Sequence, residues 1–352
     1  MKILVIQLKM IGDVLASSII CNNLKSEYPD AQIDYLVYPF TVPVVENNPN
    51  IDNLVLFEDR FVKSKWQLLK FILKIRKQKY DVVIDAYGKL ESYAVVLASG
   101  AKTKVGWKKK NSNFLFTNTL PEVKKSNSNI GLALENRLLL LKPFLKSADF
   151  DPKPKIFLTP EEIALGKKML EKFNINSSEK IYMISVLGSG ENKTYPLPFM
   201  AKILDFIAEK THATLLFNYI PSQLVEAKSV YNLCNDFTKS KIIIDLVPGN
   251  LREFMAVTYQ CNALIGNEGG AVNMAKALNI PTFTIFSTWI NKEAWNSFED
   301  GKTNISVHLK DFKPELYGEK SPKEMKEKAM DLYQNFNPEL ILPALEKYME
   351  IN

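Results

Sequence analysis

Hydrophobic and polar positions follow two patterns along the chain. Short apolar runs recur, and longer segments between them carry apolar residues at helical spacing. The runs predict strands at Lys2–Leu8, Gln32–Val37, Val82–Ile84, Ile181–Val186, Ala213–Phe217, Lys241–Ile244, Ala263–Ile265 and Thr282–Ile285. The longer segments predict helices that include Ile11–Ser26, Trp66–Lys79, Leu197–Lys210, Leu251–Gln260, Gly269–Leu278 and a final one at Pro338–Met349. Such alternation is typical of buried parallel sheets covered by helices.

The segment "SADFDPKPKIFLTPEE" interrupts this pattern at residues 147–162. Its prolines and scattered charges predict a linker. Each half begins alike, with a strand and a polar, glycine-containing turn: "ILVIQLKMIGD" in the first and "YMISVLGSGEN" in the second. A chain of 352 residues exceeds what one core usually organises. We therefore expect an α/β protein of two Rossmann-like domains, 1–150 and 151–335, facing each other across a cleft, with a helix at 336–352 packing back on the first.

Cysteines and histidines exclude several classes of protein. The three cysteines are far apart, and only two histidines are present. This content argues against a disulfide framework, a zinc spacing or a Ser-His-Asp enzyme, and it indicates a reducing, cytoplasmic compartment. The N-terminus is interrupted by Lys9 and Asp13 too early for a signal-peptide core, and no run approaches the roughly 20 apolar residues of a membrane span.

Positive charge gathers in the first half. Residues 60–110 hold 14 basic and 3 acidic residues, although the whole chain carries only +6. An anionic partner is expected there, either an anionic lipid surface or a phosphorylated acceptor. Nucleic acid is not expected, because no helix-turn-helix, zinc finger or stacking platform is found. A solvated helix face is the alternative interpretation. In the predicted helix Trp66, Leu69 and Leu73 share one face, and lysines that include Lys70 share another.

The stretch "LIGNEGGAVNMAKAL", Leu264–Leu278, places two glycines between a predicted strand and helix. Backbone N–H groups of Gly269 and Gly270 could hold a diphosphate at the helix start. Tight strand–helix packing explains the glycines equally well. The turn fits neither the dinucleotide-binding fingerprint nor a P-loop, and Glu268 adds a negative charge beside it.

Three further stretches carry candidate chemistry. Ser189 and Lys193 in "GSGENK" could share the phosphates, or belong to a solvated loop. Asp13 at the start of the first helix is a helix N-cap or a general base, and the residues alone favour the cap. The Asp-x-Asp sequence at Asp149–Asp151 has the form used by metal-dependent sugar transferases, but it lies in the linker and is interpreted as solvated.

Together these stretches resemble glycosyltransferase family 9, the ADP-heptose:lipopolysaccharide heptosyltransferases. The resemblance covers nearly the whole chain, and "IGDV" and "GNEGGAVNMAKALNIP" are its specific parts. It implies a GT-B fold and metal-independent, inverting sugar transfer without a cofactor, with no metal site. Asp13 then corresponds to the catalytic base, and Glu268 to an acid that contacts the transferred sugar.

The same resemblance assigns the remaining donor contacts. Lys193 and Ser189 correspond to phosphate and sugar contacts, Gly269 and Gly270 to N–H donors to the diphosphate, and Gln223 to the family's ribose-binding glutamate. Glu268 stands where the family usually has aspartate, and Asn273 where it commonly has histidine.

We therefore expect transfer of heptose from ADP-heptose to a lipopolysaccharide core or a related anionic, lipid-linked glycan at the inner face of the membrane. The residues expected at the acceptor are Lys9, Lys63, Lys70, Lys108, Lys109 and Lys110. Two alternatives stay open: a different nucleotide sugar for another surface polysaccharide, and a nucleotide-sugar binder without catalysis.

Overall fold

A computed structural model describes residues 1–126, 128–145, 150–176, 179–318 and 322–352. The chain divides into two compact units, Met1–Phe157 and Leu158–Asn352. The division falls seven residues beyond the expected boundary at 150/151, inside the proline-containing segment.

The first unit is built on a parallel six-stranded sheet with the order β3-β2-β1-β4-β5-β6. Its strands are β1 Lys2–Ile6, β2 Gln32–Val37, β3 Asn53–Leu56, β4 Val82–Asp85, β5 Thr103–Trp107 and β6 Asn118–Leu120. Its helices are α1 Ile11–Glu27, α2 Asp59–Lys63, α3 Lys65–Lys77, α4 Leu90–Ala98 and α5 Leu132–Leu139, with the 3-10 turns η1 Pro39–Val44 and η2 Asn113–Leu115.

Burial explains the order of this sheet. The central strands β1, β2 and β4 are almost wholly buried, whereas the edge strands β3 and β6 have no fully buried residue. Continuously apolar strands need helices over both faces. One buried cluster contains Leu4 and Ile6 of β1, Phe71 and Ile75 of α3, and Val95 of α4, so α3 and α4 cover the same face of the sheet.

The second unit repeats this plan, with the strand order β12-β11-β10-β7-β8-β9. Its strands are β7 Ile181–Ser185, β8 Thr214–Asn218, β9 Ile242–Ile243, β10 Ala263–Asn267, β11 Thr282–Ile285 and β12 Asn304–Val307. Its helices are α6 Pro160–Glu171, α7 Leu197–Thr211, α8 Leu224–Leu233, α9 Asp236–Lys241, α10 Leu251–Thr258, α11 Gly270–Ala277, α12 Lys292–Trp295, α13 Leu309–Phe312, α14 Pro322–Glu327, α15 Ala329–Tyr333 and α16 Pro338–Ile351, with the 3-10 turns η3 Glu191–Lys193, η4 Pro221–Gln223 and η5 Pro314–Leu316.

The two Rossmann-like units and all eight predicted strands are confirmed, with small differences at strand ends. The strands that the pattern did not predict are β3, β5, β6 and β12. All four carry exposed or half-buried residues, so they lack the continuous apolar run by which a buried strand is recognised.

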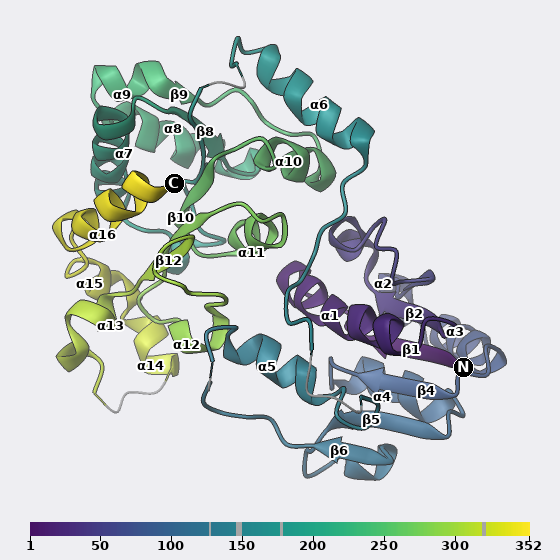
Figure 1. Cartoon of the computed structure of the whole chain (residues 1–352). Coiled ribbons are helices and arrows are strands. Elements are labelled where there is room, and N and C mark those ends of the chain that lie inside the picture. The colour runs from purple at the N-terminus through teal and green to yellow at the C-terminus, as the bar shows by residue number, and fades with distance from the viewer. Residues whose placement is uncertain (127, 146–149, 177–178, 319–321) are drawn as a thin grey trace. The chain divides into compact units, whose positions relative to one another are not determined.

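The final helix α16 belongs to the core of the second unit. It lies beside α7 (Figure 1), and its Ile341, Leu345 and Tyr348 are fully buried in that unit's cluster. The Tyr348 ring lies 5.5 Å from the ring of Phe283 on β11. The residues after 335 are therefore part of the second unit's fold rather than a separate segment.

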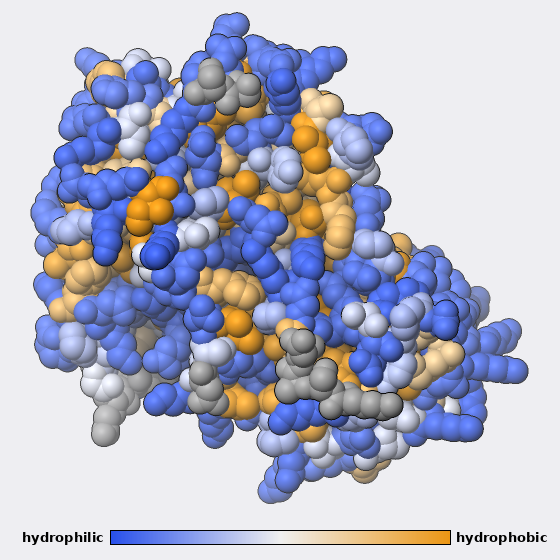
Figure 2. Space-filling model, in the orientation of Figure 1, coloured by the Kyte–Doolittle hydropathy of each residue, from blue (hydrophilic) through white to orange (hydrophobic). Residues whose placement is uncertain are grey.

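On the face shown in Figure 2 the surface is mostly hydrophilic, with smaller apolar areas between the charged residues. Within the part of the chain that the structure describes, no helix has both the length and the apolar character that crossing a bilayer requires.

Candidate active site

Loops at the carboxyl edge of the second sheet bring the predicted donor residues together. Strands β11, β10, β7 and β8 are consecutive neighbours in that sheet. The loops after them carry, in the same order, Trp289, Glu268, Lys193 and Gln223. Ligands of open parallel sheets bind outside this edge, because adjacent loops there leave a crevice.

Asn267, the last residue of β10, fastens the neighbouring loop. Its side-chain Nδ2 donates to the carbonyls of Ser185 (2.9 Å) and Val186 (3.0 Å), and its Oδ1 accepts from the Tyr195 N–H (2.7 Å). Asn267 is 1% exposed, and all three contacts satisfy buried polar groups. The loop between β7 and α7 is therefore held at both ends by one amide.

Lys193 and Glu268 face each other across this junction. The Lys193 Nζ lies 3.4 Å from Oε1 of Glu268, and 5.7 Å from the centre of the Trp289 ring. The Trp289 indole N–H and the Ser287 hydroxyl both donate to the Asn192 carbonyl, which fixes the turn that precedes Lys193. Oε1 of Glu268 is buried and accepts no hydrogen bond among the described residues, so apart from its ion pair with Lys193 its hydrogen-bonding capacity is unused.

Close packing does not explain why Gly269 and Gly270 are glycines. A Cβ built on either would meet no atom within 4 Å. Gly266 differs, because it has φ +131° and its Cβ would lie 2.4 Å from the Ser185 carbonyl oxygen. Close packing therefore explains Gly266 but not the pair that begins α11. The first-turn N–H groups of a helix have no partner within it, and they form a ready anion site when backbone can be approached.

The other predicted donor residues lie around this junction. Ser189 is exposed in the loop after β7, and Asn273 is half-buried on α11, one turn beyond the glycines. Gln223 has both ends engaged, since its Nε2 donates to the Gly188 carbonyl (2.8 Å) and its Oε1 accepts from the Ile220 N–H (3.2 Å). Gln223 thus ties the loops after β8 and β7 together.

Asp13 lies at the carboxyl edge of the first sheet. The helix begins at Ile11 with Met10 as its N-cap, so Asp13 is the third helical residue and not the N-cap that the residues alone favoured. Its Oδ2 accepts from the Met10 N–H (3.3 Å), and its Oδ1 accepts from Nη2 of Arg137 on α5 (2.6 Å). Arg137 also donates to the Ser17 hydroxyl (2.8 Å) and the Ala133 carbonyl. Both oxygens of the carboxylate are therefore held in a fixed orientation.

The predicted acceptor lysines fall into two groups. Lys9 follows β1 and Lys108, Lys109 and Lys110 follow β5, so they lie at the same edge as Asp13. Of these, Lys109 is engaged by the fold, because its Nζ donates to the Gly88 carbonyl (3.0 Å), and the Lys9 Nζ lies 5.1 Å from the centre of the Tyr38 ring. Lys63 and Lys70 are instead exposed on α2 and α3.

A buried carboxylate supports the loop after β4. Asp85 is fully buried and accepts from the Tyr87 and Gly88 N–H groups and from the Ser92 hydroxyl. Burial raises its pKa to about 6, although these hydrogen bonds act in the opposite direction. Asp85 therefore shapes the loop that Lys109 contacts.

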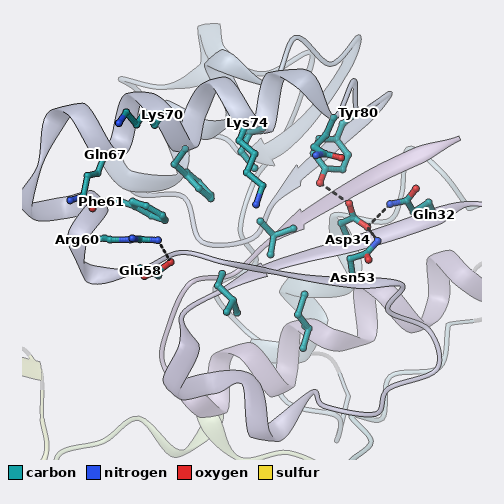
Figure 3. Close-up of a pocket in the computed structure, with 16 residues that line it drawn as sticks. Gln32, Asp34, Asn53, Glu58, Arg60, Phe61, Gln67, Lys70, Lys74 and Tyr80 are labelled. Carbon is teal, nitrogen blue, oxygen red and sulfur yellow. Dashed lines mark hydrogen bonds and ion pairs between the residues drawn. The ribbon is translucent and has the colours of Figure 1, made fainter.

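A groove of about 970 Å³ follows edge strand β3 beneath α3. Figure 3 shows the side chains that line it. Val55, Phe61 and Ile75 contribute apolar lining, while Arg60 and Lys74 contribute positive charge. The groove contains none of the predicted donor residues.

One carboxylate of the Asp-x-Asp sequence in the linker is paired with a lysine. Asp149 lies outside the described residues, whereas Asp151 forms an ion pair with Lys155 (2.6 Å). Among the residues that the structure describes, no group of three or more His, Cys, Asp and Glu residues could hold a metal ion.

Sequence reasoning missed three residues of these sites: Arg137, Asn267 and Trp289. Asn267 had a visible signal, because it is an amide at the end of an apolar strand. Arg137 had none, since it lies 124 residues from its partner Asp13 within an ordinary helical pattern.

Comparisons with known proteins show which family the chain resembles. The model of glycosyltransferase family 9 (heptosyltransferase) matches residues 68–325. Lipopolysaccharide heptosyltransferase 1 of Campylobacter coli is 27% identical over 87% of this chain and 88% of its own.

Solved structures extend the likeness to the whole fold. A family 9 glycosyl transferase from Veillonella parvula superimposes with a TM-score of 0.77, at 15% identity, over 100% of this chain and 97% of its own. The E. coli heptosyltransferase WaaC, solved with ADP-2-deoxy-2-fluoro heptose, has a TM-score of 0.64 at 16% identity, over 87% of this chain and 93% of its own. With its two parallel-sheet units of the GT-B fold, the chain belongs to glycosyltransferase family 9, the heptosyltransferase family.

Proposed function

We propose that this glycosyltransferase moves heptose from ADP-heptose to an anionic lipopolysaccharide core, with inversion at the anomeric carbon and without a metal ion. The names of its relatives support the sugar and the acceptor, because they include heptosyltransferases of lipopolysaccharide and one bound to an ADP-heptose analogue.

One observation carries the donor assignment. A buried carboxylate oxygen of Glu268 without a hydrogen-bond partner lies next to an ammonium group and two glycines whose surroundings are open. A nucleoside diphosphate sugar offers the matching groups, namely phosphate oxygens for the cations and N–H donors, and hydroxyls for the carboxylate. A bare diphosphate would gain nothing from Glu268.

The proposed reaction is a single displacement. The acceptor hydroxyl loses its proton to Asp13 while its oxygen bonds to the anomeric carbon. The bond from that carbon to the diphosphate oxygen breaks, and the electron pair leaves with the nucleoside diphosphate. Lys193 and the α11 N-terminus stabilise the negative charge that develops there. A positioned general base typically contributes about 10²–10⁴-fold to the rate.

The acceptor is assigned to the carboxyl edge of the first sheet. Lys108 and Lys110 are exposed beside Lys109 and could attract an anionic glycan through long-range charge. We expect Lys108→Gln with Lys110→Gln to raise the acceptor KM and to flatten its dependence on salt, with donor affinity unchanged. Lys109 is left intact in this variant because its ammonium group supports the Gly88 loop.

A panel of nucleotide sugars tests the proposal. The purified protein is screened by thermal shift with ADP-heptose, ADP-glucose, UDP-glucose and GDP-mannose, because a ligand of the native state raises Tm. Transfer is then measured to an isolated lipopolysaccharide core. Preference for ADP-heptose with turnover supports the proposal. Transfer from another donor would overturn the assigned sugar, and binding without turnover would indicate a non-catalytic binder.

The metal-independent mechanism has its own test. We expect full activity in excess EDTA, since Lys193 and the helix N-terminus take the place of a divalent cation at the leaving group. Loss of activity in EDTA that one divalent ion restores would show that the mechanism is wrong.

A further inference from the structure

Helix α3 has two apolar faces, and the fold uses only one. The inner face packs Phe71 and Ile75 into the core, where the Phe71 ring stacks on Phe61 at 4.5 Å. The outer face carries Trp66, Leu69 and Leu73, whose exposed fractions are 74%, 44% and 50%. Their i, i+3, i+7 spacing places them in one stripe, which we call the α3 stripe.

Positive charge borders the α3 stripe on both sides. The thirteen residues of α3 contain five basic residues and no acidic one. At 100° per residue, Lys70, Lys74 and Lys77 project on one side of the stripe, and Lys65 and Arg76 on the other. Lys70 and Lys74 form no ion pair among the described residues. Solvation of the helix face explains the exposed lysines, but it does not explain an exposed tryptophan between them.

The groove along β3 adjoins the lysine side of the stripe. In Figure 3, Lys74 extends from α3 toward the groove, which Arg60 and Phe61 of α2 line from the other side. Arg60 is already paired with Glu58 (2.6 Å), which leaves Lys70 and Lys74 as the groove-lining lysines available to an anion there. An anionic group at the lysines would therefore lie beside apolar side chains.

We propose that the α3 stripe and its bordering lysines dock this protein on the surface of an anionic phospholipid bilayer. Apolar residues that include tryptophan would enter the boundary between headgroups and acyl chains, while the lysines reach the phosphates. Helix α3 would lie in the plane of the membrane and not cross it. This partner is independent of the sugar transferred, because docking requires neither donor nor acceptor.

Charge decides between a membrane and a second copy of the chain. A symmetric dimer through the α3 stripe would bring the five basic residues of one copy against the same five of the other. Like charges at an interface are costly, whereas an anionic lipid surface is complementary to them.

Vesicle flotation of the full-length protein tests the proposal. Vesicles of phosphatidylcholine with phosphatidylglycerol are compared with phosphatidylcholine alone. We expect binding to the anionic vesicles only. The variant Trp66→Gln/Leu69→Gln/Leu73→Gln should bind at least about ten-fold more weakly, because its apolar contact is lost. The variant Lys70→Gln/Lys74→Gln/Lys77→Gln should lose about five-fold per lysine.

A matched control removes three exposed apolar residues that no basic helix face surrounds. Leu165→Gln/Val225→Gln/Leu233→Gln, on α6 and α8 of the second unit, should bind vesicles like the unmodified protein. An equal loss of vesicle binding in this control and in the stripe variant would overturn the assignment of the α3 stripe. Vesicle binding that survives in the stripe variant would overturn it too, as would the absence of binding by the unmodified protein.

Fluorescence quenching separates docking from any effect on folding. Acyl chains brominated near the headgroup should quench tryptophan emission in the unmodified protein. Trp66→Phe keeps an apolar ring and should still bind, but with this quenching abolished. Unchanged quenching in Trp66→Phe would place another surface in the membrane. A dimer detected by sedimentation that the stripe variant abolishes would assign the face to a second copy instead.

Discussion

Asp13 combines a structural and a proposed chemical role in one carboxylate. We expect Asp13→Asn to lower kcat by about 10²–10⁴-fold, because an amide cannot take the acceptor's proton. The amide oxygen can still accept from Arg137 or from the Met10 N–H, so folding and donor affinity should be largely retained. Kinetics and thermal melts of the variant measure both effects.

Ser17→Ala is the matched control for this prediction. It removes the hydroxyl that accepts from Nε of Arg137 but leaves the carboxylate of Asp13 intact. We expect less than about a ten-fold loss, since Arg137 keeps its bonds to Asp13 and to the Ala133 carbonyl. Near-normal turnover in Asp13→Asn would leave Asp13 as a helix-terminus residue only.

Substitution of Glu268 should affect binding of the sugar and binding of the diphosphate differently. Glu268→Gln keeps the size of the side chain but removes its charge, so a hydrogen bond from a sugar hydroxyl becomes roughly half as strong. We expect kcat/KM for the nucleotide sugar to fall at least about ten-fold, while affinity for ADP alone stays equal or rises. Titration calorimetry with ADP and steady-state kinetics give the two quantities.

Glu191→Gln controls for charge in the same loop region, because Glu191 is an exposed carboxylate two residues before Lys193. This variant should change neither kcat/KM for the nucleotide sugar nor the affinity for ADP. Parallel losses of ADP affinity and of turnover in Glu268→Gln would mean that Glu268 merely orients Lys193.

The start of helix α11 offers a test in which binding and stability respond differently. Gly270→Ala adds a methyl group in open space, so stability should stay the same or increase by up to about 1 kcal/mol. The same methyl group obstructs the approach of phosphates to the N–H groups, and we expect ADP to bind at least about ten-fold more weakly.

Gly266→Ala, four residues earlier, should instead lower the stability of the protein. Its Cβ would lie 2.4 Å from the Ser185 carbonyl oxygen, at φ +131°, so the second unit should lose stability. Chemical denaturation and ADP titration of both variants make the comparison. If Gly270→Ala binds ADP normally, the α11 N-terminus does not hold the diphosphate.

The stability of the whole molecule should depend on pH through Asp85. Its pKa is raised by burial to about 6, so the folded first unit retains a proton that the unfolded chain releases near pH 4. The contribution of Asp85 to the stability of the fold is therefore fully present below about pH 4 and is lost as the pH rises through about 6. Relative to Asp85→Asn, the free energy of unfolding of the unmodified protein should fall by at most about 3 kcal/mol as the pH rises from about 4 to about 8.

Denaturant unfolding of both proteins from pH 4 to pH 8 measures this difference. Asparagine can still accept from the Tyr87 and Gly88 N–H groups, so the variant should fold. A difference between the two proteins that does not change with pH would show that Asp85 is ionised throughout.

Local pattern was enough to predict most elements of both sheets. The central strands are apolar on both faces, and helices such as α1, α7 and α11 follow them at regular spacing, so their signals depend only on nearby residues. The turn proposed to bind the donor was also recognisable, because a strand, two glycines and a helix follow one another directly in the chain. Neighbouring loops at one sheet edge then bring Lys193 and Glu268 together as the parallel topology requires.

Contacts between distant segments were decided only by the tertiary structure. Periodicity shows that α3 has apolar residues on two faces, but only packing against the sheet shows that Phe71 is buried and Trp66 is exposed. The pairing of Asp13 with Arg137 and the loop ties of Asn267 likewise join residues 72 to 124 positions apart. Burial and hydrogen bonding depend on which segments meet in space, whereas periodicity reports only which residues share a face.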